Sequence, residues 1–179
     1  MVKTAEQDKI LLSDFVALFT VEEYDIYGEK NWQPFACPTR ASSLSALYAL
    51  LPGSFPLLYE HLVLCYRWPQ ADLPTCTLLA NPAGAGLDGL LSQVQSDKSL
   101  WDTLVPSGYV QFGRDRGGNY DPICFDTRHG WRDDDCRIVQ IDHEEILCNR
   151  RIKEVGELAG GFREFVELNL GHSLSKRAA

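Results

Sequence analysis

The sequence lacks the features that would place it in a membrane or direct it out of the cell. Its longest apolar stretches are far shorter than the ~18 residues that a membrane-spanning helix needs, so we expect no membrane association. Residues 1–9 are polar and contain no apolar segment followed by a cleavage site. We therefore expect no export signal and a cytoplasmic location.

Paired cysteine motifs are also missing. The chain has 6 cysteines, and no two of them show the C-x-x-C spacing that is typical of zinc sites and redox motifs. Several lie inside apolar runs, as Cys65 and Cys124 do, and Cys148 also has apolar neighbours. Buried, reduced thiols of a cytosolic protein are the simplest interpretation, with no disulfide and no bound metal.

The common catalytic and cofactor motifs are absent or incomplete. After His143-Glu144, Leu147 stands where the zinc motif H-E-x-x-H needs its second histidine, and no G-x-S-x-G elbow occurs. The string 84–89 matches G-x-G-x-x-G, but it lacks the strand–turn–helix context and the later acidic residue of a dinucleotide site. We therefore predict no enzyme and no cofactor. A cysteine nucleophile paired with one of the 4 histidines stays open.

Composition predicts a single domain over residues 1–179 that can bury its own core. The 17 basic and 25 acidic side chains give a net charge of −8. Such a charge opposes sequence-independent binding to nucleic acid and favours a basic partner. It is also common in soluble proteins that have no such partner.

The most distinctive stretch predicts a β-hairpin followed by a further strand. Two apolar runs, 109–112 and 123–125, flank a turn that contains Gly117, Gly118 and Asn119. Glycine and asparagine tolerate positive φ, so we expect at least one of these glycines to adopt it. The run 137–142 alternates with a period of two and predicts another strand of the same sheet.

Helical patterns surround this hairpin. Apolar residues recur at helical spacing over 6–19, 87–94 and 98–104, and in two segments between Ser42 and Tyr66 that Pro52-Gly53 separates. An irregular aromatic segment completes residues 1–41. A final helix is predicted over 157–170, with Gly171 as its C-cap and a loose tail over 172–179.

An acidic run, Asp133-Asp134-Asp135, follows the hairpin and lies near Trp131. It is open to three interpretations: a solvated loop, a protein-binding patch, or a metal site. Our functional hypothesis is that these aspartates form part of a partner-binding surface with Trp131 and Tyr120. On the simpler alternative, the loop is solvated and Trp131 packs on the core.

The order of segments resembles a known family. The motifs are the helical pair from Leu51-Pro52 to Tyr66, Phe112-Gly113, the turn Gly117-Gly118-Asn119, the strand ending at Asp126, the strand from Arg137 to His143, and Phe162-Arg-Glu-Phe165. Together they resemble the SUKH superfamily over roughly residues 42–170. That superfamily includes a yeast cell-wall assembly regulator and many bacterial immunity proteins. In this chain Asn119 and Tyr120 stand where the family often has a small or acidic residue.

The resemblance implies an α+β fold with a mixed or antiparallel sheet of about five or six strands, flanked by N-terminal helices and a C-terminal helix. It also implies binding rather than catalysis, because bacterial members neutralise toxins, often nucleases or deaminases. A basic toxin would suit the negative charge. A regulatory adaptor or scaffold of the same fold, with no toxin partner, and an unrecognised enzyme using cysteine and histidine are the alternatives.

Overall fold

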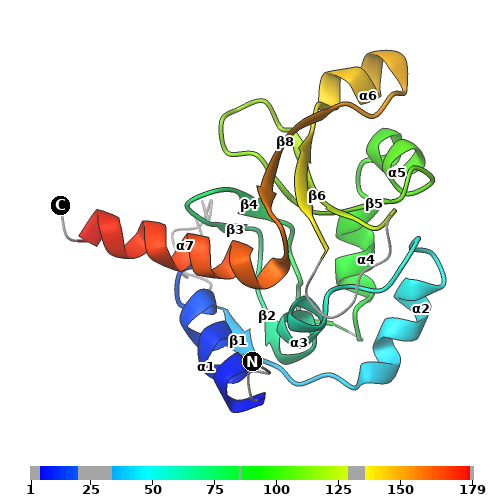
Figure 1. Ribbon diagram of the computed structural model, residues 1–179. Helices are drawn as coiled ribbons and strands as arrows, with labels where there is room; N and C mark the ends of the chain where they lie inside the picture. The colour runs from blue at the N-terminus through cyan, green and yellow to red at the C-terminus, as the bar shows by residue number, and fades with distance from the viewer. Residues whose placement is uncertain (1–4, 20–33, 85, 129–135, 178–179) are drawn as a thin grey trace, which may run out of the picture.

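The computed structural model describes residues 5–19, 34–84, 86–128 and 136–177. Within these residues the chain forms a mixed α+β fold around a six-stranded antiparallel sheet of order β3-β4-β5-β6-β7-β8, as predicted (Figure 1). The strands are β3 Ala71–Asp72, β4 Thr77–Leu78, β5 Tyr109–Arg114, β6 Pro122–Asp126, β7 Ile138–Ile141 and β8 Glu154–Ala159. A separate pair joins β1 Phe35–Ala36 to β2 Tyr66–Arg67.

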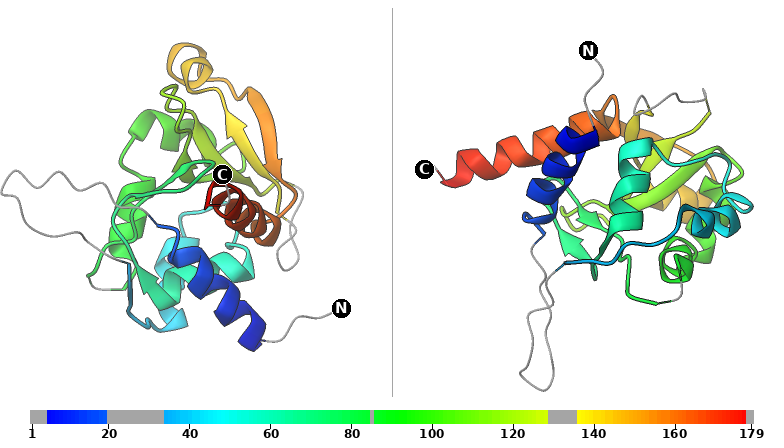
Figure 2. Two further views of the ribbon diagram at one scale, coloured as in Figure 1. Left: turned by 90° about the vertical axis from the view of Figure 1, so that its left-hand side faces the viewer. Right: turned by 90° about the horizontal axis from the view of Figure 1, so that it is seen from below.

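Helices cover both faces of the large sheet. They are α1 Ala5–Val16, α2 Leu44–Tyr48 after a 3-10 turn Ala41–Ser43, α3 Leu57–Cys65, α4 Asp88–Val94, α5 Lys98–Leu104, α6 His143–Asn149 and α7 Phe162–Arg177. Helices α1 and α7 come from opposite ends of the chain and pack together (Figure 2), with the rings of Phe15 and Phe162 6.2 Å apart. None of the helices in the described ranges is long and apolar enough to cross a membrane.

The buried side chains of the strands point alternately to one face of the sheet and to the other, and they fall into two apolar clusters. Val110 and Phe112 of β5 belong to the larger cluster, which also takes in α1, α3 and α7. Tyr109 of β5 and Cys124 of β6 belong to the smaller one, with α5 and α6. Successive side chains of a strand point to opposite faces, so a sheet covered on both faces needs unbroken apolar runs. Residues 123–125 of β6 form such a run, whereas β5 also buries the polar Gln111, whose amide donates to the Gly113 carbonyl at 3.1 Å.

Aromatic rings fill the centre of the larger cluster. The rings of Phe112 and Phe125 stack 4.2 Å apart across β5 and β6. Tyr59 of α3 and Phe162 of α7 meet edge to face at 5.1 Å above them. Burying each such ring contributes about 1.5–3 kcal/mol to folding, so this cluster ties both helices to the sheet.

The C-terminal region corrects the prediction of one helix over 157–170. Residues Glu154–Ala159 form β8, which pairs with β7, and the helix begins only at Phe162. The backbone N–H of Gly160 donates to the Glu164 carboxylate at 2.7 Å at this junction. The helix then continues through Gly171 to Arg177, so Gly171 is not a C-cap and residues 172–177 are not a loose tail. A glycine inside a helix costs only about 1 kcal/mol.

The cysteines are less uniformly buried than the sequence suggested. All six are free thiols in the structure, and Cys76, Cys124 and Cys136 are buried as expected. Cys65 and Cys148, however, are exposed. Each lies at or near the C-terminal end of a short helix, where apolar sequence neighbours do not guarantee burial.

Candidate binding site at the β5–β6 turn

The turn between β5 and β6 reverses the chain through two left-handed residues. Gly118 has φ +86°, which confirms that at least one turn glycine adopts positive φ. Tyr120 has φ +58°, a conformation that side chains other than glycine, asparagine and aspartate seldom adopt. The Asp115 carboxylate accepts a hydrogen bond from the Gly117 N–H at 2.9 Å, and the Asp115 N–H donates to the Asp121 carbonyl at 2.8 Å. These bonds hold the turn closed.

The residue after Tyr120 connects the turn to α6. The carboxylate of Asp121 is nearly buried and accepts a hydrogen bond from the His143 backbone N–H at 3.0 Å. The His143 ring Nδ1 lies 2.9 Å from the same oxygen, and the Gln140 side chain donates to the other oxygen at 2.8 Å. Burial alone would raise the pKa of Asp121, but these hydrogen bonds outweigh it and hold the pKa below its usual range. Asp121 is therefore an ionised anchor for the first turn of α6.

A hollow of about 440 Å³ opens beside this anchor. It is lined by Asn119, Asp121, Asp142, His143, Glu144, Lys153, Glu154 and Val155. The lining comes from the β5–β6 turn, the start of α6 and the start of β8. Lys153 crosses it to bind Asp142 at 2.8 Å. We refer to these eight residues as the acidic hollow.

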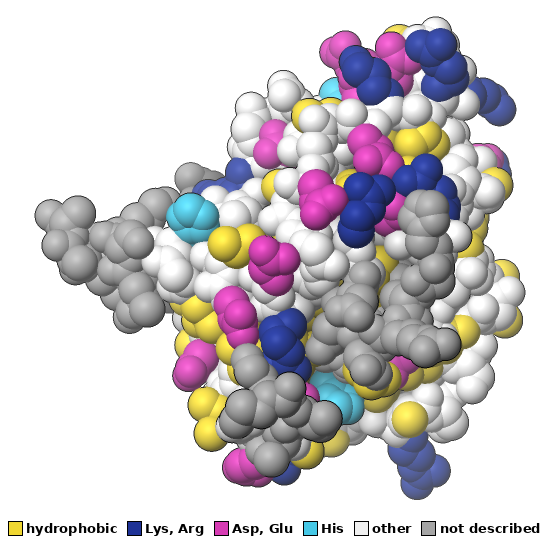
Figure 3. Space-filling model, viewed as in Figure 1, with side chains coloured by type: hydrophobic (Ala, Val, Ile, Leu, Met, Phe, Trp, Pro, Cys, Tyr) yellow, Lys and Arg dark blue, Asp and Glu magenta, His cyan; other side chains and the backbone are white. Residues whose placement is uncertain are grey.

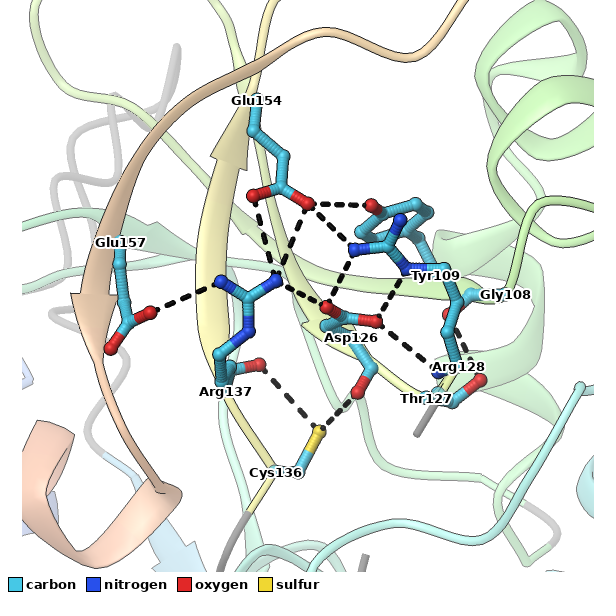
Figure 4. Close-up of polar contacts among 9 residues, drawn as sticks. All are labelled: Gly108, Tyr109, Asp126, Thr127, Arg128, Cys136, Arg137, Glu154 and Glu157. Carbon is cyan, nitrogen blue, oxygen red and sulfur yellow. Dashed lines mark hydrogen bonds and ion pairs between the residues drawn. The ribbon is translucent and has the colours of Figure 1, made fainter. Parts of the chain in front are cut away.

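Glu154 connects the acidic hollow to an ion-pair network on β6, β7 and β8. Figure 4 shows the Asp126 carboxylate between two arginines, Arg128 and Arg137, which approach it at 2.9 and 2.6 Å. Both arginines also bind Glu154, at 2.7 and 3.4 Å. The outer guanidinium nitrogen of Arg137 binds Glu157 at 3.1 Å. Figure 3 shows acidic and basic side chains gathered together over β8 and α6.

Burial and charge perturb several groups in this network. Hydrogen bonds from Arg128, against the opposing effect of burial, hold the pKa of Asp126 well below its usual range. The Tyr109 hydroxyl donates to Glu154 at 2.8 Å, and burial together with that bond raises the pKa of Tyr109. The guanidinium carbon of Arg128 lies 4.7 Å from the centre of the Tyr109 ring. The charges of this face are therefore held in place by contacts within the fold.

The chemistry available in the acidic hollow is limited. The Asp121–His143 pair is the arrangement of a general base and its orienting carboxylate. No serine, threonine or cysteine lines the hollow, so the pair has no adjacent side-chain nucleophile there. Across the described ranges, no group of three or more His, Cys, Asp and Glu side chains is arranged to hold a metal ion.

Of the predicted binding residues, the structure describes only Tyr120, which is exposed and stands in the chain between two lining residues of the acidic hollow. Gly117, Gly118 and Asn119 lie in the turn between β5 and β6, as predicted. Trp131, Asp133, Asp134 and Asp135 lie outside the described residues. Sequence reasoning missed Asp121, Lys153 and Val155. Only His143-Glu144 had been noted, as an incomplete acid–base motif, and its partner Asp121 lies 22 residues away.

Comparison with known proteins assigns no family to the chain. A scan against protein-family models finds no match, and a search of curated proteins finds none either.

Proposed function

We propose that this chain is a cytoplasmic, non-catalytic protein-binding domain of the SUKH type, an immunity protein that neutralises a bacterial toxin by occluding its active site. The observed α+β architecture is the one that the resemblance implies. The single observation that carries the proposal is Tyr120, a largely exposed aromatic side chain with a left-handed backbone in the turn beside the acidic hollow.

Tyr120 has the properties of an interface anchor. It is 67% exposed, the highest value among the large hydrophobic side chains of the described residues. A left-handed backbone at a tyrosine costs roughly 1–3 kcal/mol, and such strain persists where the surrounding structure holds it, often at functional positions. Tyrosine offers a large contact area with few rotatable bonds, so it loses little entropy on binding.

The surroundings of Tyr120 match an interface rim. Val155 is 54% exposed and lines the acidic hollow, which gives a second apolar contact. Asp121, Asp142 and Glu144 line the hollow with Val155, and Tyr120 adjoins it in the chain between the lining residues Asn119 and Asp121. Apolar anchors among charged groups are typical of specific interfaces, and an acidic rim speeds encounter with a basic partner. The net charge of −8 acts in the same direction.

A capture and inhibition experiment tests the proposal. The full chain is used to capture partners from native lysate, and each captured protein is identified by mass spectrometry and assayed as a nuclease or deaminase. We expect one partner whose activity falls in proportion to the added chain and vanishes at a one-to-one ratio. Tyr120→Ala is expected to weaken binding about 30-fold or more, as for an interface hot spot.

Two control variants make the result specific. Ile10→Ala removes another highly exposed apolar side chain, on α1, and is expected to leave affinity unchanged. His143→Asn removes the base of the Asp121–His143 pair, and the catalytic alternative predicts loss of activity of the chain itself. A partner that binds without any loss of activity would favour the adaptor. A partner bound equally well by Tyr120→Ala would contradict this site.

A further inference from the structure

Cys37 and Cys65 lie directly opposite each other where the first strand pair meets the end of α3. In that pair, Phe35 is opposite Arg67 and Ala36 is opposite Tyr66. The next position along the same antiparallel register places Cys37 opposite Cys65. The backbone N–H of Cys37 donates to the carbonyl of Cys65 at 2.8 Å, so the pairing continues to these two residues.

Neighbouring hydrogen bonds hold the two cysteine segments together. Beyond the cysteines the pairing shifts by one residue, because the partner chain belongs to α3: the backbone N–H of Thr39 donates to the Leu64 carbonyl at 2.7 Å, where the β1–β2 register would place Val63. The buried Arg67 guanidinium bridges the segments, since it donates to the Thr39 hydroxyl on one side and to the Val63 carbonyl on the other. The two cysteine backbones are therefore constrained from both ends.

This geometry lies within the range that a disulfide needs. The 2.8 Å bond from the Cys37 N–H to the Cys65 carbonyl brings the two backbones to the spacing of paired antiparallel chains, in which opposite residues have Cα atoms about 4.5–5.5 Å apart. Disulfides join residues whose Cα atoms are roughly 4.4–6.8 Å apart. Cys65 is exposed and Cys37 is partly exposed, so a small oxidant can reach the pair.

We propose that Cys37 and Cys65 form a site of reversible disulfide formation that reacts with low-molecular-weight disulfides such as glutathione disulfide. The Cys65 thiolate attacks glutathione disulfide, whose S–S bond breaks, and one glutathione thiolate leaves. The Cys37 thiolate then attacks the Cys65 sulfur of the mixed disulfide and releases the second glutathione. Two protein thiols are oxidised, one glutathione disulfide is reduced, and the two protons pass to the released glutathiones.

The other cysteines do not compete for this reaction. Burial raises the pKa of Cys76 to about 12, and it also raises the pKa values of Cys124 and Cys136. Thiols that stay protonated and buried are poor nucleophiles. Cys148 is exposed, but it lies on α6, away from the strand pair, and would form only an adduct.

The disulfide would close a loop of about 28 residues between β1 and the end of α3. It would tie the segment that begins with β1 to α3, whose Tyr59 packs in the aromatic cluster. Oxidation would then add a covalent link to this pairing, and reduction would leave it held by the backbone hydrogen bonds alone. The inference is independent of the proposed binding site.

The test uses the full chain carrying Cys148→Ser, so that the exposed thiol of α6 cannot form an adduct. After incubation with glutathione disulfide and without reductant, we expect the intact mass to fall by about 2 Da, for two hydrogens lost. Peptide mapping under non-reducing conditions should join the Cys37 and Cys65 peptides. The oxidised protein should melt several degrees above the reduced protein, and dithiothreitol should reverse both changes.

Single variants provide the matched controls. Adding Cys37→Ser should replace the disulfide with one glutathione adduct on Cys65 and abolish the rise in melting temperature. Adding Cys76→Ser should leave the Cys37–Cys65 disulfide unchanged. An unchanged mass, stable glutathione adducts on both Cys37 and Cys65, or a disulfide that joins two molecules through Cys65 would each overturn the proposal.

Discussion

Asp126 and Arg137 are joined across β6 and the start of β7 by a 2.6 Å contact between a carboxylate that is 1% exposed and a guanidinium at the surface. Arg128 binds the same carboxylate from the other side. A buried carboxylate is stable only if its charge is compensated. The network that surrounds Asp126 is therefore a structural requirement of the sheet, and through Glu154 it borders the acidic hollow.

Replacing Asp126 with Asn is expected to destabilise the protein by about 2 kcal/mol, because charged hydrogen bonds to two arginines are lost. Urea denaturation at pH 7 measures the change. Glu157→Gln is the matched control, since Glu157 binds Arg137 at a far more exposed position. We expect less than about 0.5 kcal/mol for that variant. Equal losses in the two variants would contradict the role assigned to Asp126.

The same carboxylate should make stability depend on pH in the acid range. The pKa of Asp126 is lower in the folded protein than in the unfolded chain. Its contribution is therefore complete above about pH 4, the pKa of an unfolded aspartate, and is lost progressively as the pH falls further. Denaturation midpoints measured between pH 7 and pH 3 should fall less steeply for Asp126→Asn than for the unmodified chain. Parallel curves would show that other carboxylates dominate.

Arg67 should be among the most sensitive charged positions. It is 1% exposed and donates to the Val63 and Tyr66 carbonyls at 2.6 and 2.9 Å, which satisfies the end of α3. Arg67→Met removes the charged donor from both carbonyls, which keep the Asn81 amide at 3.0 and 2.8 Å, and is expected to cost about 2 kcal/mol. Arg116→Met, at a half-exposed arginine that also donates to a backbone carbonyl, is the control and should cost less than about 1 kcal/mol. Chemical denaturation of both variants decides between these expectations.

Gly118 should not tolerate a β-branched side chain. Its φ of +86° is unfavourable for valine, so Gly118→Val is expected to destabilise by at least about 1 kcal/mol. Gly156 in β8 is the matched control, because a Cβ at either glycine would meet no atom within 4 Å and only Gly118 has positive φ. Gly156→Val should be neutral or slightly stabilising in a strand. Thermal unfolding of the two variants isolates the backbone effect from any clash.

The acidic run Asp133-Asp134-Asp135 lies outside the described residues, and its part in binding stays a prediction. Changing Asp133, Asp134 and Asp135 together to asparagine is expected to leave folding intact and to slow association with the partner, most clearly at low salt. Trp131→Ala is expected to raise the dissociation rate instead. Association measured at two salt concentrations decides the matter. A triple variant that binds as fast as the unmodified chain at both concentrations would remove these aspartates from the binding surface.

Sequence pattern alone predicted those helices and strands whose conformation depends mainly on residues close to them in the chain. The apolar runs on either side of Gly117-Gly118 predicted β5 and β6, because a turn that needs positive φ and two strands buried on both faces leave a clear mark in sequence. The stripe of Phe162, Phe165 and Val166 likewise predicted the core of α7. The α+β class was what the resemblance to a known family implied, and the structure has it.

Tertiary contacts decided the rest. The residues of β8 are mostly exposed and carry no strong strand pattern, and they are extended because β7 offers a ladder of backbone hydrogen bonds. Helix α7 continues through Gly171 although the local sequence favours a stop there. The acidic hollow arises only when Asp121 meets His143 from a distant segment. Propensity acts between near neighbours, whereas pairing and ion contacts join residues that only the folded chain brings together.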